Sequence, residues 1–168
     1  MKIGIVSDSH GKSERLNAAI IAMKRSQVEA IVHCGDISDP DDIDRLAETG
    51  VAVYVVAGNM DHRVSRLREV AEKRGVHFSS EVLEVPLGDG CHLVATHGHD
   101  QRVLGELIAD QQFGYVCHGH THCRRDERID KTRVINPGAL CHPKRPPVPS
   151  AAILDTGSDT LDWLEIDV

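Results

Sequence analysis

The first 57 residues alternate between short apolar runs and amphipathic segments, and this alternation restricts the fold more than any other feature of the chain. The apolar runs cover residues 2–7, 30–33 and 51–57, and each has the length and composition of a buried strand. The segments between them have the residue spacing of helices that bury one face. The order strand, helix, strand, helix, strand predicts an α/β sheet at the start of the chain.

Local signals place the ends of these helices. Ser13 is expected to cap the first helix, which would bury Leu16, Ile20 and Met23 on one face. The second helix is expected to begin at Pro40, with Gly50 closing it. A third helix is expected to follow the third strand and to end near residue 75.

The pattern changes after residue 75, where strands connected by hairpins predominate. We expect strands at residues 76–78, 113–117 and 133–135, a helix at residues 103–108, and a polar turn at residues 124–126. Two hairpins are expected, one joining residues 82–85 to 91–95 around residues 87–90, and one joining residues 151–154 to 161–166. These elements predict an α/β fold of two packed sheets with helices outside, formed as a single domain over residues 1–168.

Composition excludes several classes of partner. The net charge is −7, the basic residues are scattered and aromatic residues make up 3% of the chain, so nucleic acid is not an expected partner. No apolar run is long enough to span a bilayer. Five cysteines without a C-x-x-C pair predict reduced thiols, and we expect a cytoplasmic protein.

Polar clusters follow five of the expected strands, and each has a glycine within a residue or two. They are Asp8 with His10, Asp36, Asn59, His97 with His99, and His120 with His122. Ligands of open α/β sheets bind at the carboxyl ends of the strands, where these clusters lie. Taken alone, the histidines at residues 118–122 are explained about equally well by a surface histidine tract, and Asp36 and Asn59 would more often be ordinary turn residues. A zinc knuckle around Cys117 and Cys123 has the wrong spacing. Taken together, the five clusters predict one metal site.

The other histidines are expected to play no part in this site. His33 lies within an apolar strand and is expected to be a hydrogen-bonded core residue. His118 precedes Gly119 and is expected to point away from the metals. The remaining four are expected at the surface: His62, His77, His92 and His142.

The order of these clusters resembles the signature of the calcineurin-like metallophosphoesterases. The motifs D-x-H, GD, GN-x-D, HGH and GHxH stand here at residues 8–10, 35–36, 58–61, 97–99 and 119–122. The Asn136-Pro137-Gly138 turn is similar to that of the small stand-alone bacterial and archaeal phosphodiesterases of the superfamily. The resemblance implies a four-layer αββα sandwich of two mixed β-sheets flanked by helices.

The resemblance also implies two divalent metal ions and their ligands. One ion would be held by Asp8, His10, Asp36 and His122, and the other by Asp36, Asn59, His97 and His120. Asp36 would then bridge ions about 3.5–4 Å apart, and a metal-bridging hydroxide would attack the phosphoryl group in line. The mixed nitrogen and oxygen donors favour Mn, Fe, Zn, Co or Ni over Mg or Ca, with Mn as our first choice.

One position departs from the family pattern. The residue after Asn59 is histidine or cysteine in many relatives and could donate a proton to the leaving group, but here it is Met60. We therefore expect a phosphodiesterase rather than a monoesterase, with His99 and Asp61 as the catalytic candidates beyond the metal ligands. His99 would contact the substrate or donate a proton, unless it is merely a solvated turn residue, and Asp61 would support a ligand from behind.

The expected substrate is a small phosphodiester or nucleotide, and the resemblance implies a small homo-oligomer. Two alternative functions remain open at this point. One is a non-catalytic metal-binding scaffold of the same fold, although all seven ligand positions are intact. The other is a nuclease, which the negative charge and the absence of a capping insertion disfavour.

Overall fold

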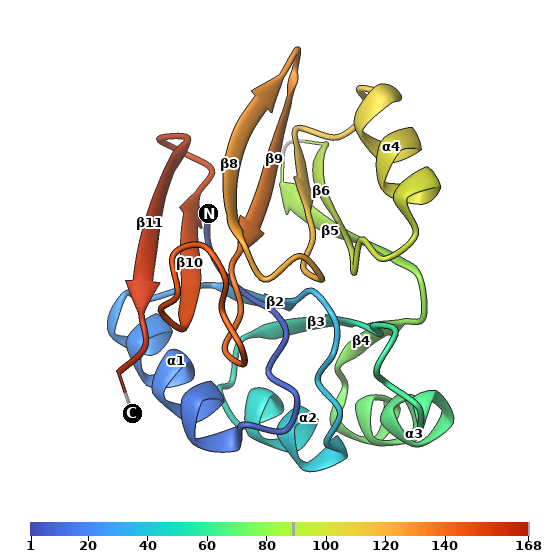
Figure 1. Cartoon of the computed structure of the whole chain (residues 1–168), viewed down its shortest axis with the longest axis vertical. Coiled ribbons are helices and arrows are strands. Elements are labelled where there is room, and N and C mark those ends of the chain that lie inside the picture. The colour runs from blue at the N-terminus through green and yellow to red at the C-terminus, as the bar shows by residue number, and fades with distance from the viewer. Residues whose placement is uncertain (89, 168) are drawn as a thin grey trace.

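The computed structural model describes residues 1–88 and 90–167, which fold into two β-sheets packed face to face (Figure 1). The first sheet has the strand order β11-β10-β1-β2-β3-β4, and the second has the order β5-β6-β7-β9-β8. Both sheets are mixed, since each combines a parallel core with antiparallel strands at its edges. The expectation of a two-sheet α/β fold is confirmed.

The parallel part of the first sheet comes from the alternating N-terminal region. Strands β1 to β4 run parallel because helices connect them, while β10 and β11 form a hairpin that adds to the free side of β1. The strand bounds are β1 Lys2–Val6, β2 Ala30–His33, β3 Ala52–Val56, β4 His77–Ser79, β10 Ser150–Asp155 and β11 Thr160–Glu165.

The second sheet has parallel strands β6, β7 and β9 at its centre and an antiparallel strand on each side. The strand bounds are β5 Val82–Gly88, β6 Cys91–Thr96, β7 Tyr115–Cys117, β8 Arg124–Ile129 and β9 Thr132–Pro137. The β5–β6 hairpin is confirmed, but residue 89 in its predicted turn lies outside the described residues.

Helices cover the outer faces of both sheets, which gives the expected four layers (Figure 1). The helix bounds are α1 Ser13–Arg25, α2 Pro40–Ala47, α3 Val64–Arg74 and α4 Gln101–Ala109. Buried side chains such as Leu16, Ile43 and Leu67 pack α1, α2 and α3 on the first sheet, and Leu104 packs α4 on the second. Between the sheets lies a third apolar layer that includes Ile5 and Leu93. None of these described helices combines the length and apolar character needed to cross a bilayer.

The start of α2 follows the local sequence signals. Asp39 caps α2, because its side chain accepts a hydrogen bond from the Asp41 N–H, and Pro40 is the first helical residue. The expectation for Ser13 is wrong. Helix α1 already begins at Ser13, Lys12 occupies the capping position, and no side chain caps this end.

The predicted turn at residues 124–126 is also wrong, because these residues begin β8. The strand has mostly polar, partly exposed side chains, so it lacks the apolar run on which a strand prediction depends. Its stability comes instead from pairing along β9, where the Arg133 guanidinium lies 2.7 Å from Asp126 Oδ1.

His33 is a hydrogen-bonded core residue, as expected, and its ring is held in one protonation state. It is fully buried at the end of β2. The Gly35 N–H donates to its Nδ1 at 3.2 Å, so Nε2 must carry the proton and donate to Ser9 Oγ at 3.1 Å. A second proton would lie between Nδ1 and the Gly35 N–H. Burial lowers the pKa of His33 to about 4.

This arrangement predicts that acid destabilises the fold through His33. In the unfolded chain the ring binds a proton below about pH 6.5, whereas in the folded chain it stays neutral down to about pH 4. The free energy of unfolding should therefore fall by about 3 kcal/mol from this group between pH 6.5 and pH 4. Urea unfolding at several pH values measures the slope.

The matched variant is His33→Asn, whose amide oxygen can accept from Gly35 N–H but does not titrate. Its stability should depend less steeply on pH across this window than that of the native protein. Identical slopes for the two proteins would contradict the assignment.

Candidate metal centre

The predicted metal ligands lie in five loops that follow the carboxyl ends of β1, β2, β3, β6 and β7. These strands belong to both sheets, and their loops meet at one open cleft of about 590 Å³. The cleft is lined by His10, Lys12, Asp36, Asn59, Met60, His120, His122, Cys141 and His142. His97 and Asp8 are fully buried beside it.

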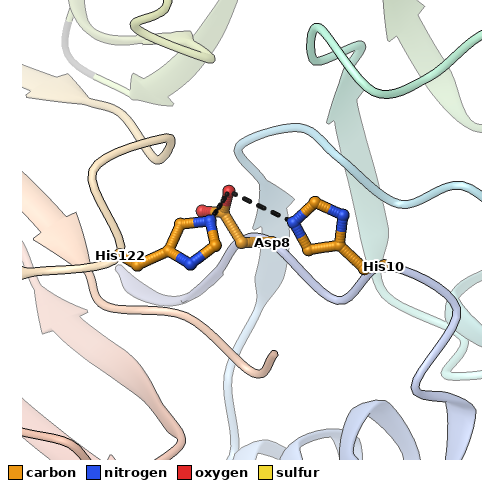
Figure 2. Close-up of side chains that lie close together, drawn as sticks. All are labelled: Asp8, His10 and His122. Atoms are coloured by element: carbon orange, nitrogen blue, oxygen red, sulfur yellow. Dashed lines mark ion pairs between the residues drawn. The ribbon is translucent and has the colours of Figure 1, made fainter. Parts of the chain in front are cut away.

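A first cluster consists of Asp8, His10 and His122, which Figure 2 shows in close-up. Asp8 Oδ1 lies 3.1 Å from Nε2 of His122 and 3.9 Å from Nε2 of His10. The two rings approach this carboxylate from opposite sides (Figure 2). Oδ2 of Asp36 lies 3.6 Å from the same His10 nitrogen. Four ligand side chains thus converge.

A second cluster lies on the other side of Asp36. Nε2 of His97 lies 3.3 Å from Asp36 Oδ2 and 3.0 Å from Asn59 Oδ1. Nδ1 of His120 lies 3.0 Å from the same Asn59 oxygen. Asp8, Asp36 and His97 also offer ligand atoms within 4.8 Å of one another, so the two clusters adjoin. Asp36 Oδ2 is close to a histidine of each cluster.

The hydrogen bonds of two histidines leave lone pairs facing carboxylates. Nδ1–H of His97 donates to the Cys34 carbonyl at 2.8 Å, and Nδ1–H of His122 donates to the His142 carbonyl at 2.9 Å. In each neutral ring, Nε2 is then unprotonated and faces an aspartate oxygen. Such a contact is repulsive unless a cation, either a proton or a metal ion, lies between the two atoms.

Two buried atoms of the first cluster also fit a metal ion. Within residues 1–88 and 90–167, neither Asp8 Oδ1 nor His10 Nε2 makes a hydrogen bond, although both are buried. Buried polar atoms nearly always have a hydrogen-bond partner, so these two atoms are suited to bind an ion instead. Carboxylate oxygen and imidazole nitrogen are the donors that divalent transition metals prefer. The residues present therefore fit such ions.

The electrostatics of the clusters agree with this arrangement. Burial alone would raise the pKa of Asp8, but His122 and Ser7 outweigh it and the pKa falls below its ordinary value. Burial opposes ionisation of Asp36 as well, and His97 lowers its pKa overall. Asp8 raises the pKa of His122. The carboxylates are thus held ionised, which is the form that binds metal.

The backbone at the ligands is unusual. Five of the seven have a left-handed conformation, with φ angles between 46° and 65°: Asp8, His10, Asp36, His120 and His122. This conformation costs about 1–2 kcal/mol per residue, and it clusters where structure serves function. Glycine is required beside them for space. A Cβ at Gly58 would collide with the Asp36 carboxylate, and one at Gly119 would collide with the Ser7 hydroxyl.

Asp61 holds two of the ligand loops together. Its carboxylate accepts hydrogen bonds from the backbone N–H groups of Asp36, Ser38 and Gly58 at 3.0, 2.7 and 2.7 Å. It is 4% exposed and is not among the described residues that line the cleft. Burial raises its pKa despite these donors. These hydrogen bonds hold the backbone of the loops that carry Asp36 and Asn59. None of them involves His10.

Asn136 has a similar position behind the His120 loop. Its side-chain amide donates to the Gly119 carbonyl at 2.8 Å and to Thr121 Oγ1 at 3.0 Å. Its Oδ1 accepts from the Gly138 N–H, which closes the turn that follows. The Asn136-Pro137-Gly138 turn thereby fixes the loop that carries two ligands.

His99 and Met60 lie at the outer part of the site. The His99 ring is exposed, and its centre lies 5.6 Å from that of His97 and 6.3 Å from that of His120. Met60 is 46% exposed and lines the cleft. Its backbone N–H donates to Asp36 Oδ1 at 2.8 Å, so this position also orients the carboxylate.

Most of the other histidines are where the sequence placed them. His62 and His77 are exposed, and His92 is partly exposed. The His118 ring is buried against the Gly119 carbonyl and does not belong to the described cleft lining. His142 is exposed, but it lines the cleft and its carbonyl orients His122, which sequence reasoning missed. Lys12 and Cys141 were missed as well, since neither belongs to a motif.

Comparison with known proteins shows the family of the chain. The calcineurin-like phosphoesterase superfamily domain matches residues 1–159. A phosphodiesterase of Methanocaldococcus jannaschii is 32% identical over 93% of both chains. A probable metallophosphoesterase of Methanothermobacter thermautotrophicus is 33% identical over 96% of this chain and 90% of its own. The solved structure of an archaeal phosphodiesterase superposes with a TM-score of 0.88 at 30% identity, covering 99% of this chain and all of that one.

The contacts of Asp61 predict that it controls metal affinity. In Asp61→Asn, an N–H₂ group would replace one acceptor oxygen and face a backbone N–H, so the Asp36 loop and the Gly58 turn should separate. Mn²⁺ affinity, measured by calorimetry, should fall by about 10–100-fold, as when other residues behind metal ligands are changed.

The control is Asp155→Asn, which makes the same change at a carboxylate that accepts the Gly157 N–H far along the chain. Equal metal affinity in the two variants would show that Asp61 does not position the ligands.

Proposed function

The chain belongs to the calcineurin-like phosphoesterase superfamily of metal-dependent phosphoester hydrolases, and on that basis we propose that it hydrolyses phosphodiesters with two divalent metal ions. The observation that carries this proposal is the position of Asp36 Oδ2, which lies 3.6 Å from His10 of the first cluster and 3.3 Å from His97 of the second. A mononuclear site would need only one of these clusters.

We assign the first ion to Asp8, His10, Asp36 and His122, and the second to Asp36, Asn59, His97 and His120. The assignment is supported by the convergence of these side chains at 3.0 to 3.9 Å within each cluster. Two adjacent cations repel, and a shared carboxylate reduces that repulsion. Four of the seven donors are imidazole nitrogens and the others are oxygens, which favours a divalent transition metal over Mg or Ca, and manganese is our first choice among these.

When bound, the ions would supply Lewis acidity to the phosphoryl oxygens and a water acidified to hydroxide near neutral pH for in-line attack. The chain's own part is to hold the ligands rigid. Asp61 and Asn136 fix the loops from behind, and the Met60 N–H orients Asp36. The Cys34 and His142 carbonyls keep the correct ring nitrogens of His97 and His122 free.

We propose that the substrate is a small diester, such as a nucleotide derivative, rather than a monoester. The support is Met60, an exposed thioether at the cleft that cannot donate a proton to a poor leaving group. The cleft volume of about 590 Å³ suits a ligand larger than phosphate. The name of the similar M. jannaschii protein is also that of a phosphodiesterase.

We propose different roles for the two further candidates. His99 is exposed beside His97 and His120, which supports a role in contacting the leaving group or giving it a proton. Asp61 is buried and occupied by backbone N–H groups, which supports a positioning role only.

Residues 1–168 are proposed to act as one domain, because the ligands come from both sheets and neither sheet alone would hold the ions. A cytoplasmic location and assembly into a small homo-oligomer stay predictions, as does the absence of nucleic-acid binding.

The test is hydrolysis by the Mn²⁺-loaded protein of bis(p-nitrophenyl) phosphate and of p-nitrophenyl phosphate. The diester should be the better substrate, and a chelator should abolish both activities. Asp36→Ala and His120→Ala should lose more than the roughly 10–100-fold that supporting residues cost, because they remove ligands themselves. His62→Ala removes an exposed histidine outside the cleft and serves as the control.

Two outcomes would contradict the proposal. Turnover of the monoester that equals or exceeds that of the diester would refute the role given to Met60. Binding of two ions without hydrolysis of either ester would favour a metal-binding scaffold.

A further inference from the structure

We propose that Lys12 makes the cleft selective for diesters that carry a second anionic group, a phosphate or a carboxylate, on one ester arm. This inference rests on the proposed function and names the substrate class of the same site. It concerns a residue that lies outside every metal-binding motif of the chain.

Lys12 follows the first ligand pair in the loop between β1 and α1. It lines the cleft together with His10 and Asp36, and it is the one lysine or arginine among the described lining residues. It also lines a neighbouring cavity of about 400 Å³, together with Gly11, Ser13, Glu14 and Arg15. Lys12 is thus the lining residue that the cleft and this neighbouring cavity share.

The backbone of Lys12 is fixed while its side chain has no partner. Its N–H donates to the Ser9 carbonyl at 2.8 Å, and its carbonyl accepts from the Leu16 N–H at 3.1 Å. Its side chain is exposed, and within the described ranges it makes no ion pair or hydrogen bond. The Arg15 side chain, in contrast, already has a hydrogen-bond partner, since its Nη1 donates to the Leu140 carbonyl at 2.7 Å.

An unpaired ammonium group in this position favours anions over neutral groups. The chain has a net charge of −7, so the cleft would otherwise repel a substrate with more than one negative charge. The scissile phosphoryl group would be neutralised at the metal centre. Lys12 is therefore available for a second charge, which its flexible four-carbon side chain can reach.

Glu14 limits where this second charge can lie. It lines the neighbouring cavity, and its carboxylate would repel an anion placed deep inside that cavity. The favourable position for the second anionic group is between Lys12 and the metal ligands, on the ester arm that extends from the scissile phosphorus. A diester with two uncharged arms would leave Lys12 without a partner.

The test compares two substrates with the same scissile bond. They are the p-nitrophenyl ester of thymidine 5′-phosphate, and the same ester carrying a 3′-phosphate. The Mn²⁺-loaded protein should show kcat/KM about tenfold higher for the second, equivalent to about 1.4 kcal/mol. Lys12→Gln should bring the ratio close to one, and Lys12→Glu should invert it.

A matched control is Lys24→Gln, which removes the same charge from the other end of α1 without touching the cleft. It should retain the ratio of the native protein. Loss of the ratio in Lys24→Gln as well would assign the effect to net charge and overturn the role of Lys12.

A binding measurement separates this inference from the proposed function. Calorimetry should show that thymidine 3′,5′-bisphosphate binds about tenfold more tightly than thymidine 5′-phosphate, and that Lys12→Gln removes the difference. If neither ester is hydrolysed, the proposed function fails, while the affinity ratio still tests Lys12. If both esters are hydrolysed equally well by the native protein, the inference is wrong and the diesterase stands.

Discussion

Carboxylate oxygens and unprotonated imidazole nitrogens face one another at the cleft where the loops of the two sheets meet, and the surrounding structure holds them in that position. The Asp8–His122 and Asp36–His97 contacts are attractive only with a cation between the atoms. Backbone carbonyls hold the opposite ring nitrogens, so neither ring can turn to relieve the repulsion. A site of this kind is arranged for charged species that come from outside the chain.

The fold supplies rigidity for that arrangement. Parallel strands from two sheets bring five loops to one edge, and the apolar layer between the sheets fixes their separation. Left-handed backbone at five ligands raises the cost of the native loops, and the carboxylate of Asp61 and the amide of Asn136 help to offset it with hydrogen bonds. Strain and support are located together, as expected of a preorganised site.

The sequence predicted the strands and helices in which apolar residues recur at regular spacing, and it predicted the ligand motifs that follow those strands. Strands β1 to β3 and their helices are local consequences of composition, and the polar residues that follow them share an edge because of the parallel topology. Strand β8 could not be predicted in this way, because its charged side chains are stabilised by β9 and not by burial. The expected cap at Ser13 failed because Lys12 takes that position without a side-chain hydrogen bond.

The supporting contacts of the site were the least visible in the sequence. The Cys34 and His142 carbonyls act through the backbone, which any residue could provide. Lys12 and Cys141 reach the cleft only through tertiary packing.

The most direct measurement of the two-metal site is an anomalous-difference map at the manganese edge from crystals grown with Mn²⁺. We expect two peaks in the cleft, both in contact with Asp36. A cleft without a peak, or a single ion that does not touch Asp36, would contradict the account.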